Sequence, residues 1–278
     1  MTNPIADPLV EVPDTEATTD LVTVEATPDG VATLTLNRPA KRNAFNDEVI
    51  AALNQALETL HQADGVRIVF VRGAGSTFSA GADLDWMRGA FERTEADNVE
   101  DAYEMAKALK ALHDLPALTV ALVQGGAYGG GAGLVAACDV AVATADAQFG
   151  FTEVKLGIIA ATISPYVVAA VGPRMAKRLF ATGAAFGAEE AKAWGLVHEV
   201  VADAAGLEAA KAEWAGSMGP CAPGAIGASK ALVDAVYGQE IDHGLMMETA
   251  KRIAEARVSE EGQEGLRAFL ERRKPSWA

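Results

Sequence analysis

The chain has 278 residues, and half of them are hydrophobic, which is enough to bury a sizeable core. Its formal net charge of −15 argues against binding to nucleic acid or to anionic membranes. The two cysteines, Cys138 and Cys221, form no CxxC pair and accompany no histidine cluster, so no disulfide framework or metal site is expected. That cysteine usage is typical of the reducing cytoplasm.

No targeting or membrane-spanning segment is expected. The first residues, Met-Thr-Asn-Pro, lack the basic and apolar regions of a secretory signal, and no apolar stretch is long enough to cross a bilayer. Residues 1–20 are rich in Pro, Thr, Asp and Glu, a composition that predicts a disordered acidic tail.

The rest of the chain alternates between strand and helix patterns and then becomes helical. The pattern predicts strands over residues 31–36, 67–71, 118–123, 139–143 and 198–201, and helices from Asn46 or Asp47 to about His61, over 98–113 and over 132–137, with helices dominating after Ser164. This order favours an α/β core over residues 21–205 and a helical C-terminal region over residues 206–278.

The glycines 129–131 lie between a predicted strand and a predicted helix, where a helix can bind an anion. A P-loop is excluded because no Gly-Lys-Ser/Thr follows. The pattern Gly131-x-Gly133-x-x-Ala136 fits a dinucleotide fingerprint, but no acidic residue ends the next strand. A third interpretation is an oxyanion site, with a second amide supplied by the loop over residues 78–83. Alternatively, the glycines only permit tight helix–strand packing.

Glu153 is the candidate proton carrier because its neighbours are mostly apolar, which would raise the pKa of its carboxyl group. The alternative is an exposed glutamate paired with Lys155. The four histidines are scattered and lie near no serine or cysteine nucleophile motif, so no catalytic triad is proposed.

Several motifs then occur in order along the chain. They are Leu36-Asn37-Arg38-Pro39 with Asn43-Ala44-Phe45-Asn46, Phe78-Ser79-Ala80-Gly81-Ala82-Asp83-Leu84, Gly129-Gly130-Gly131 with Ala137-Cys138-Asp139, and Phe149-Gly150 with Glu153 and Leu156-Gly157. Together with Glu190-Ala191-Lys192-Ala193-Trp194-Gly195 and Phe269-Leu270-Glu271-Arg272-Arg273-Lys274-Pro275, they resemble the enoyl-CoA hydratase/isomerase (crotonase) superfamily over about residues 21–275.

The resemblance implies an α/β fold, a spiral of ββα units with a C-terminal helical trimerisation region. It implies homotrimers or homohexamers, acyl-CoA thioester substrates, and neither a metal nor a cofactor beyond the CoA of the substrate. By the family's motif, Ala82 and Gly130 donate the oxyanion amides, and Glu153 exchanges a proton with the α-carbon. The residues implied along the substrate are Lys41, Arg42, Ala44, Ala80, Gly81, Asp83, Leu84 and Gly129, with Ala80 and its neighbours at the adenine and Lys41 or Arg42 at the phosphates.

Two departures from the family pattern concern the reaction. Hydratases with two carboxylates carry a second glutamate where this chain has Gly133. After Gly157, a run from Ile163 to Val168, Ile-Ser-Pro-Tyr-Val-Val, is similar to 3-methylglutaconyl-CoA hydratase-type sequences. The expected activity is hydration of a 2-enoyl-CoA in fatty acid or leucine catabolism, possible alternatives being Δ3–Δ2-enoyl-CoA isomerisation or a non-catalytic acyl-CoA-binding role.

Overall fold

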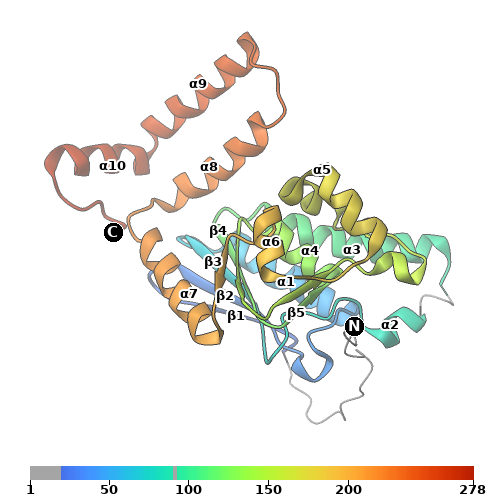
Figure 1. Cartoon of the computed structure of the whole chain (residues 1–278). Coiled ribbons are helices and arrows are strands. Elements are labelled where there is room, and N and C mark those ends of the chain that lie inside the picture. Colours follow the sequence, from blue (N-terminus) through green and yellow to red (C-terminus); the bar gives the residue numbers. More distant parts are fainter. Residues whose placement is uncertain (1–19, 90–92) are drawn as a thin grey trace.

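The structure is a computed structural model that describes residues 20–89 and 93–278, so most of the predicted N-terminal tail lies outside the described residues (Figure 1). A six-stranded sheet forms its centre, in the order β1-β2-β3-β4-β6-β9. The strands are β1 (Val22–Ala26), β2 (Val31–Leu36), β3 (Ile68–Gly73), β4 (Leu118–Val123), β6 (Val140–Thr144) and β9 (Glu199–Val201). Only β1 runs antiparallel to its neighbour; the other pairings in this sheet are parallel.

Side chains alternate between the two faces of this sheet, as the period of a β-strand requires. In β3, Val69 and Val71 join the main core, whereas Ile68 and Phe70 join a second core on the opposite face. The helices that contribute to the main core are α1 (Asp47–Gln62), α3 (Glu95–His113), α4 (Gly130–Ala137), α5 (Ser164–Thr182) and α6 (Ala188–Trp194). The opposite face is covered by α7 (Ala204–Met218), which packs Leu207 against the sheet (Figure 1).

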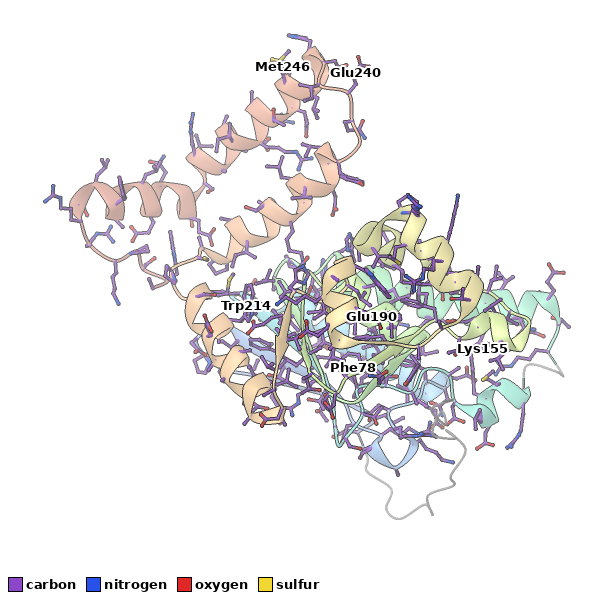
Figure 2. All side chains as sticks on the ribbon, in the orientation of Figure 1. Phe78, Lys155, Glu190, Trp214, Glu240 and Met246 are labelled. Atoms are coloured by element: carbon purple, nitrogen blue, oxygen red, sulfur yellow. The ribbon has the colours of Figure 1, made fainter. Side chains whose placement is uncertain are left out.

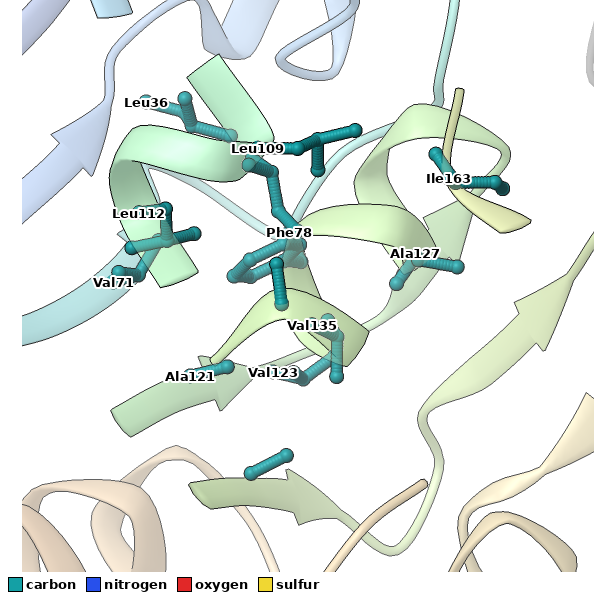
Figure 3. Packing of buried hydrophobic residues seen from close by; sticks show 14 of the residues in the cluster. Leu36, Val71, Phe78, Leu109, Leu112, Ala121, Val123, Ala127, Val135 and Ile163 are labelled. Atoms are coloured by element: carbon teal, nitrogen blue, oxygen red, sulfur yellow. The ribbon is translucent and has the colours of Figure 1, made fainter. Parts of the chain in front are cut away.

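The main core is assembled from segments that are far apart in the sequence. Figure 3 shows Phe78, from the loop after β3, surrounded by Leu36 of β2, Leu109 of α3 and Val135 of α4. Phe78 is fully buried. The packing therefore fixes the start of the loop over residues 78–83 relative to α3 and α4.

Local capping explains where two of the helices begin. Asn46, one of the two residues at which the sequence predicts the start of this helix, caps α1, since its side chain accepts a hydrogen bond from the amide of Val49. Helix α3 begins at Glu95, three residues before the predicted position, because Thr94 and Asp97 form a capping box there.

A second sheet was not predicted from the sequence. It consists of β5 (Gly126–Tyr128), β7 (Gln148–Gly150) and β8 (Phe186–Gly187), with β5 parallel to β7 and β7 antiparallel to β8. These strands are two or three residues long, which is too short for alternation of polar and apolar residues to reveal them. The short helices are η1 (Pro39–Lys41), α2 (Leu84–Gly89), η3 (Glu153–Leu156) and α6 (Ala188–Trp194).

The last three helices extend away from the sheet and form what we call the C-terminal arm: α8 (Pro223–Val236), α9 (His243–Val258) and α10 (Glu260–Glu271) (Figure 1). Glu240 and Met246 lie at its far end (Figure 2). At its base, Lys230 Nζ contacts Asp139 Oδ2 at 2.6 Å and donates to the Ala117 carbonyl at 2.8 Å. No helix within the described residues is long and apolar enough to cross a membrane.

Candidate active site

The loop over residues 78–83 lies between β5 and the segment that precedes α1. Ser79 exchanges two backbone hydrogen bonds with β5, each 3.0 Å long. On the other side of the loop, Phe45 donates its amide to the carbonyl of Gly81 and accepts from the amide of Asp83, both at 2.8 Å. These bonds hold the loop on both sides, next to the junction between β5 and α4.

Gly81 and Gly129 allow the loop and the junction to approach each other closely. A Cβ on Gly81, whose φ is +88°, would lie 2.8 Å from the carbonyl oxygen of Tyr128. Gly129 has φ +49° and forms the N-cap of α4. Both glycines occupy the left-handed region that side chains disfavour, so the backbone geometry itself requires glycine.

Ala82 and Gly130 follow these two glycines directly. Gly130 is the first residue of α4, where a helix leaves its amides without internal acceptors. Within residues 20–89 and 93–278, neither the amide of Ala82 nor that of Gly130 donates a hydrogen bond. The structure thus places two backbone amides that donate no hydrogen bond among the described residues on adjoining segments, where the sequence predicts a pair of oxyanion donors.

Glu153 comes three residues after β7 and begins η3. Its Oε1 lies 3.2 Å from the position that a Cβ on Gly129 would take, which puts the carboxyl group beside the glycine junction. Its Oε2 is buried and has no hydrogen-bond partner among the described residues. Burial raises the pKa of Glu153 above its usual range.

Lys155 does not neutralise this carboxyl group. Its side chain extends toward Gly183, where an added Cβ would lie 3.2 Å from Lys155 Cε. The surroundings of Glu153 are therefore those of a desolvated carboxyl group and not those of an exposed ion pair.

The other glycines of the segment pack against protein. A Cβ on Gly131 would lie 2.7 Å from Ser79 Cβ, and one on Gly133 would lie 2.2 Å from Ile163 Cγ2. A dinucleotide fingerprint needs these glycines to admit a pyrophosphate. Here they admit side chains of the protein instead, which removes the basis for that interpretation.

Comparison with known proteins identifies the family to which this site belongs. A family model described as enoyl-CoA hydratase/isomerase matches residues 26–278. The chain belongs to the enoyl-CoA hydratase/isomerase family. The expectations of an enzyme of this family and of a crotonase fold are therefore confirmed.

Individual relatives match this chain along most of its length. The enoyl-CoA isomerase/hydratase fer4 of Mycosarcoma maydis is 34% identical over 258 residues, covering 88% of this chain and 92% of that protein. An enoyl-CoA hydratase structure from Shewanella pealeana has a TM-score of 0.88 at 38% identity and covers 92% of this chain and 96% of its own. Pseudomonas aeruginosa AtuE has a TM-score of 0.88 at 40% identity, covering 93% and 99%.

In this member of the family, Ile163 fills the space at Gly133. Ile163 is 2% exposed, and Leu109 Cδ2 lies 3.7 Å from the position of a Cβ on Gly133. A second carboxylate at residue 133 would have to displace this apolar contact. The sequence shows that the second glutamate is absent, but it does not show that Ile163 occupies the space beside residue 133.

The residues predicted along the CoA lie near one another but differ in exposure. Ala44, Gly81 and Asp83 are buried, Lys41, Ala80 and Gly129 are half-buried, and Arg42 and Leu84 are exposed. Lys41 Nζ lies 3.8 Å from Asp85 Oδ2. Arg42 and Asn43 both adopt left-handed backbone conformations, with φ of 51° and 55°, which turn this segment toward the loop over residues 78–83.

The Asp83 carboxyl group forms an ion pair with Arg38. Burial alone would raise the pKa of Asp83, but the hydrogen bonds from Arg38 and from the amide of Asp85 hold it below its usual value. Among the described residues, no group of three or more His, Cys, Asp or Glu side chains is placed to hold a metal ion.

Proposed function

We propose that the protein catalyses the hydration of a 2-enoyl-CoA thioester and the reverse dehydration. The proposal is carried by the buried Oε2 of Glu153, which lies without a partner among the described residues and beside the junction that holds the amides of Ala82 and Gly130. A carboxylate that loses hydration without gaining a cation is a stronger base near neutral pH than an exposed one. The two amides supply the donors that a thioester enolate requires.

In the hydration direction, the oxygen of water forms a bond to the β-carbon while Glu153 accepts a proton from that water. The electron pair of the double bond moves onto the thioester oxygen, where hydrogen bonds from Ala82 and Gly130 stabilise the enolate, each by about 3 kcal/mol. The enolate then collapses, and its α-carbon takes the proton from Glu153. One water molecule is added and no group leaves.

We infer that the CoA moiety lies along the segments 41–44 and 80–84, beside this junction. The positive charges of Lys41 and Arg42 support contacts to its phosphates, because both belong to a segment that hydrogen-bonds the loop at Ala80. Asp85, close to Lys41, would compete with a phosphate for that cation. The inferred contacts need no metal and no cofactor besides the CoA of the substrate.

Isomerisation of a 3-enoyl-CoA to a 2-enoyl-CoA is the second candidate, and the contact between Gly133 and Ile163 favours it. Glu153 would take a proton from the α-carbon, the double bond would shift, and the same proton would return at the γ-carbon. This reaction needs one carboxylate and no bound water. The name of the Mycosarcoma maydis relative combines both activities.

A branched substrate with its own carboxylate, such as 3-methylglutaconyl-CoA, would make hydration compatible with a single glutamate. The substrate carboxylate would orient the water in place of the second glutamate. The run of residues 163–168 supports this choice of substrate, and its first residue, Ile163, is the one that fills the space at Gly133.

A substrate panel tests the proposal. The purified protein is incubated with crotonyl-CoA, 3-methylglutaconyl-CoA and 3-hexenoyl-CoA, and the products are separated by chromatography. Hydration of either 2-enoyl substrate supports the proposal, whereas conversion of the 3-enoyl substrate alone would replace it by isomerisation.

A glutamine substitution separates catalysis from simple binding. Glu153→Gln is expected to lower kcat by about 10²–10⁴-fold, the usual effect of losing a general acid or base. Glu189→Gln, at an exposed position on α6, is the matched control and should retain full activity. Full turnover by Glu153→Gln would show that this residue is not the acid–base group. If the unmodified protein turns over none of the substrates, a non-catalytic acyl-CoA-binding role is favoured instead.

We also propose that the protein assembles into a homotrimer or a dimer of trimers. Large hydrophobic side chains on the C-terminal arm are exposed to solvent in the single chain, among them Ile241 at 83%, Phe269 at 80% and Leu270 at 79%. Surfaces of this kind are usually covered by a partner. Other copies of this chain are the partners that the family resemblance implies.

A further inference from the structure

We propose that Arg38 and Asp83 form a clamp that positions the backbone amide of Ala82, so that both act as positioning residues for the reaction. The inference rests on the proposed function, in which the Ala82 amide stabilises an enolate oxygen. Asp83 directly follows Ala82, and its carboxylate accepts a hydrogen bond from the Arg38 guanidinium. Arg38 also donates to the carbonyl oxygen of Ala44 at 3.3 Å, which ties the pair to the segment before α1.

Asp83 is held at four of its atoms, one of which is its carbonyl oxygen, which accepts a hydrogen bond from the amide of Met87 at 2.9 Å. Besides its contact with Arg38, its amide donates to the carbonyl of Phe45 at 2.8 Å, and its Oδ1 accepts from the amide of Asp85 at 2.8 Å. Its side chain is only 5% exposed. The peptide that joins Ala82 to Asp83, which carries the Asp83 amide, therefore has little freedom to rotate, although Ala82 itself is exposed.

The residues before Ala82 are held by a second branch of the same network. The amide of Arg38 donates to Asn43 Oδ1 at 2.9 Å, and the carbonyl of Asn43 accepts from Ser79 Oγ at 2.8 Å. Ser79 Oγ in turn accepts from the amide of Gly81 at 3.2 Å. Arg38 is thus connected to both sides of Ala82, through its guanidinium on one side and through its backbone on the other.

The Ala82 amide makes no hydrogen bond of its own within the described residues, so its direction is set by its neighbours. An oxyanion donor is effective only when it points at the position of the developing charge, and a misplacement of about 1 Å can cost about 100-fold in rate. A half-buried guanidinium bound to a buried carboxylate provides this rigidity through a charge-assisted hydrogen bond. Because the Asp83 side chain is buried and paired with Arg38, removing its charge should impair the position of the Ala82 amide more than the CoA contacts inferred for residues 80–84.

Two variants and one control test the clamp. Asp83→Asn keeps the side-chain shape and an acceptor for the Asp85 amide but removes the charge, and Arg38→Lys keeps the positive charge but loses the planar donor geometry. Arg72→Met is the control, because it removes a different half-exposed ion pair, with Glu208, at 2.9 Å. Each protein is assayed for kcat and KM on its best substrate. The infrared carbonyl band of bound butyryl-CoA, labelled with ¹³C at the thioester carbon, is recorded for each.

We expect kcat to fall about 10–100-fold in Asp83→Asn and less in Arg38→Lys, with KM changing by less than about threefold. The carbonyl band, which shifts to lower frequency on binding to the wild type, should shift less in both variants and normally in Arg72→Met. A carbonyl shift in Asp83→Asn equal to that of the wild type would overturn the clamp. A wild-type protein that binds butyryl-CoA without shifting the band would reject the oxyanion site itself, and the clamp with it.

Discussion

The carboxyl group of Glu153 is desolvated on folding and gains no ion pair among the described residues. Its ionised form is therefore less stable in the folded protein than in the unfolded chain, where water surrounds it. The same loss of hydration that makes Glu153 a useful base should lower the stability of the fold at neutral pH. Desolvation of Glu153 thus favours activity and at the same time disfavours stability.

The pH dependence of stability follows from this shift. A raised carboxyl pKa in the folded state means that the fold binds a proton more tightly than the unfolded chain does, so stability falls as pH rises through the window above the ordinary value of 4.5. Glu153→Gln removes the cost of burying the charge. We expect the variant to melt at a higher temperature than the wild type at pH 7–8, with the difference shrinking as pH falls toward that ordinary value.

Calorimetry across this pH range checks the expectation. A variant that is less stable than the wild type at pH 7–8, or whose difference from it does not change with pH, would show that the ionised carboxylate does not destabilise the fold.

The contact between Gly133 and Ile163 predicts strong energetic coupling. Gly133→Ala would place a Cβ 2.2 Å from Ile163 Cγ2, and the resulting overpacking should cost about 1–3 kcal/mol of unfolding free energy. Ile163→Ala should cost about 2–5 kcal/mol by leaving a cavity. The double variant should lose less unfolding free energy than the two single variants lose together, by at least about 0.5 kcal/mol. A double-mutant cycle based on denaturant unfolding measures this difference. Gly216→Ala, where an added Cβ meets no atom within 4 Å, is the control.

Some parts of the site follow directly from the sequence and others do not. The glycines at a strand–helix junction indicated an amide donor, and the apolar neighbours of Glu153 indicated a raised pKa. Burial does raise the pKa of Glu153, whereas the donor role of the amides stays a prediction. Ile163 could not be assigned, because its contact with Gly133 joins residues 30 positions apart that no local pattern relates. The contact between Arg38 and Asp83 could not be predicted for the same reason, since the two residues lie 45 positions apart. The catalytic and binding roles themselves stay predictions.

At the scale of elements, long and strongly patterned segments were predicted well. Helix α1 begins after Asn46, one of the two predicted starting residues, and β4 has the predicted bounds. Strand β1 and the three short strands of the second sheet were missed, because their pairing depends on tertiary neighbours. The division of the chain at residue 205 stays a prediction.

In the C-terminal arm, an ion pair between Arg273 and Glu264 ties α10 to the residues after it. Arg273 contacts Glu264 at 2.6 Å, and this hydrogen bond lowers the pKa of Glu264 to about 2. Trp277 packs close by, since a Cβ on Gly265 would lie 3.1 Å from its ring. Because the folded pKa is depressed, the contribution is fully present above the unfolded value of 4.5 and is lost as pH falls toward 2.

Fluorescence reports on this contact in a background in which Trp86, Trp194 and Trp214 are replaced by Phe, so that Trp277 is the one indole that emits. In this background we expect the emission to move toward that of a solvent-exposed indole as pH falls from about 4.5 to 2, before the core unfolds. Glu264→Gln should show the exposed emission already at neutral pH, with Glu271→Gln as a milder control because its contact with Arg273 is more exposed. A buried-type emission in Glu264→Gln at pH 7 would contradict this account.

At the scale of the whole molecule, the exposed side chains of the C-terminal arm predict dependence on assembly. Phe269→Glu places a charge at a position that the proposed interface would bury, and it should shift the particle mass from a multiple of 28.8 kDa to that of one chain. Val99→Glu, at a position on α3 that is 64% exposed, is the control and should leave the mass unchanged. Light scattering after size-exclusion chromatography measures both. A wild-type mass of one chain would contradict the proposed trimer. The cytoplasmic location expected from the sequence stays a prediction.

The separation of the C-terminal arm from the sheet has a consequence for amide hydrogen exchange. The amides of β3 and β4 lie between neighbouring strands beneath packed helices, so their exchange should require global unfolding of the core. Amides in α9, whose described residues are mostly exposed, should exchange through local opening instead. If other chains cover the arm, that opening becomes rarer as the protein concentration rises. Deuterium uptake in α9 would then slow on concentration while uptake in β3 stays constant.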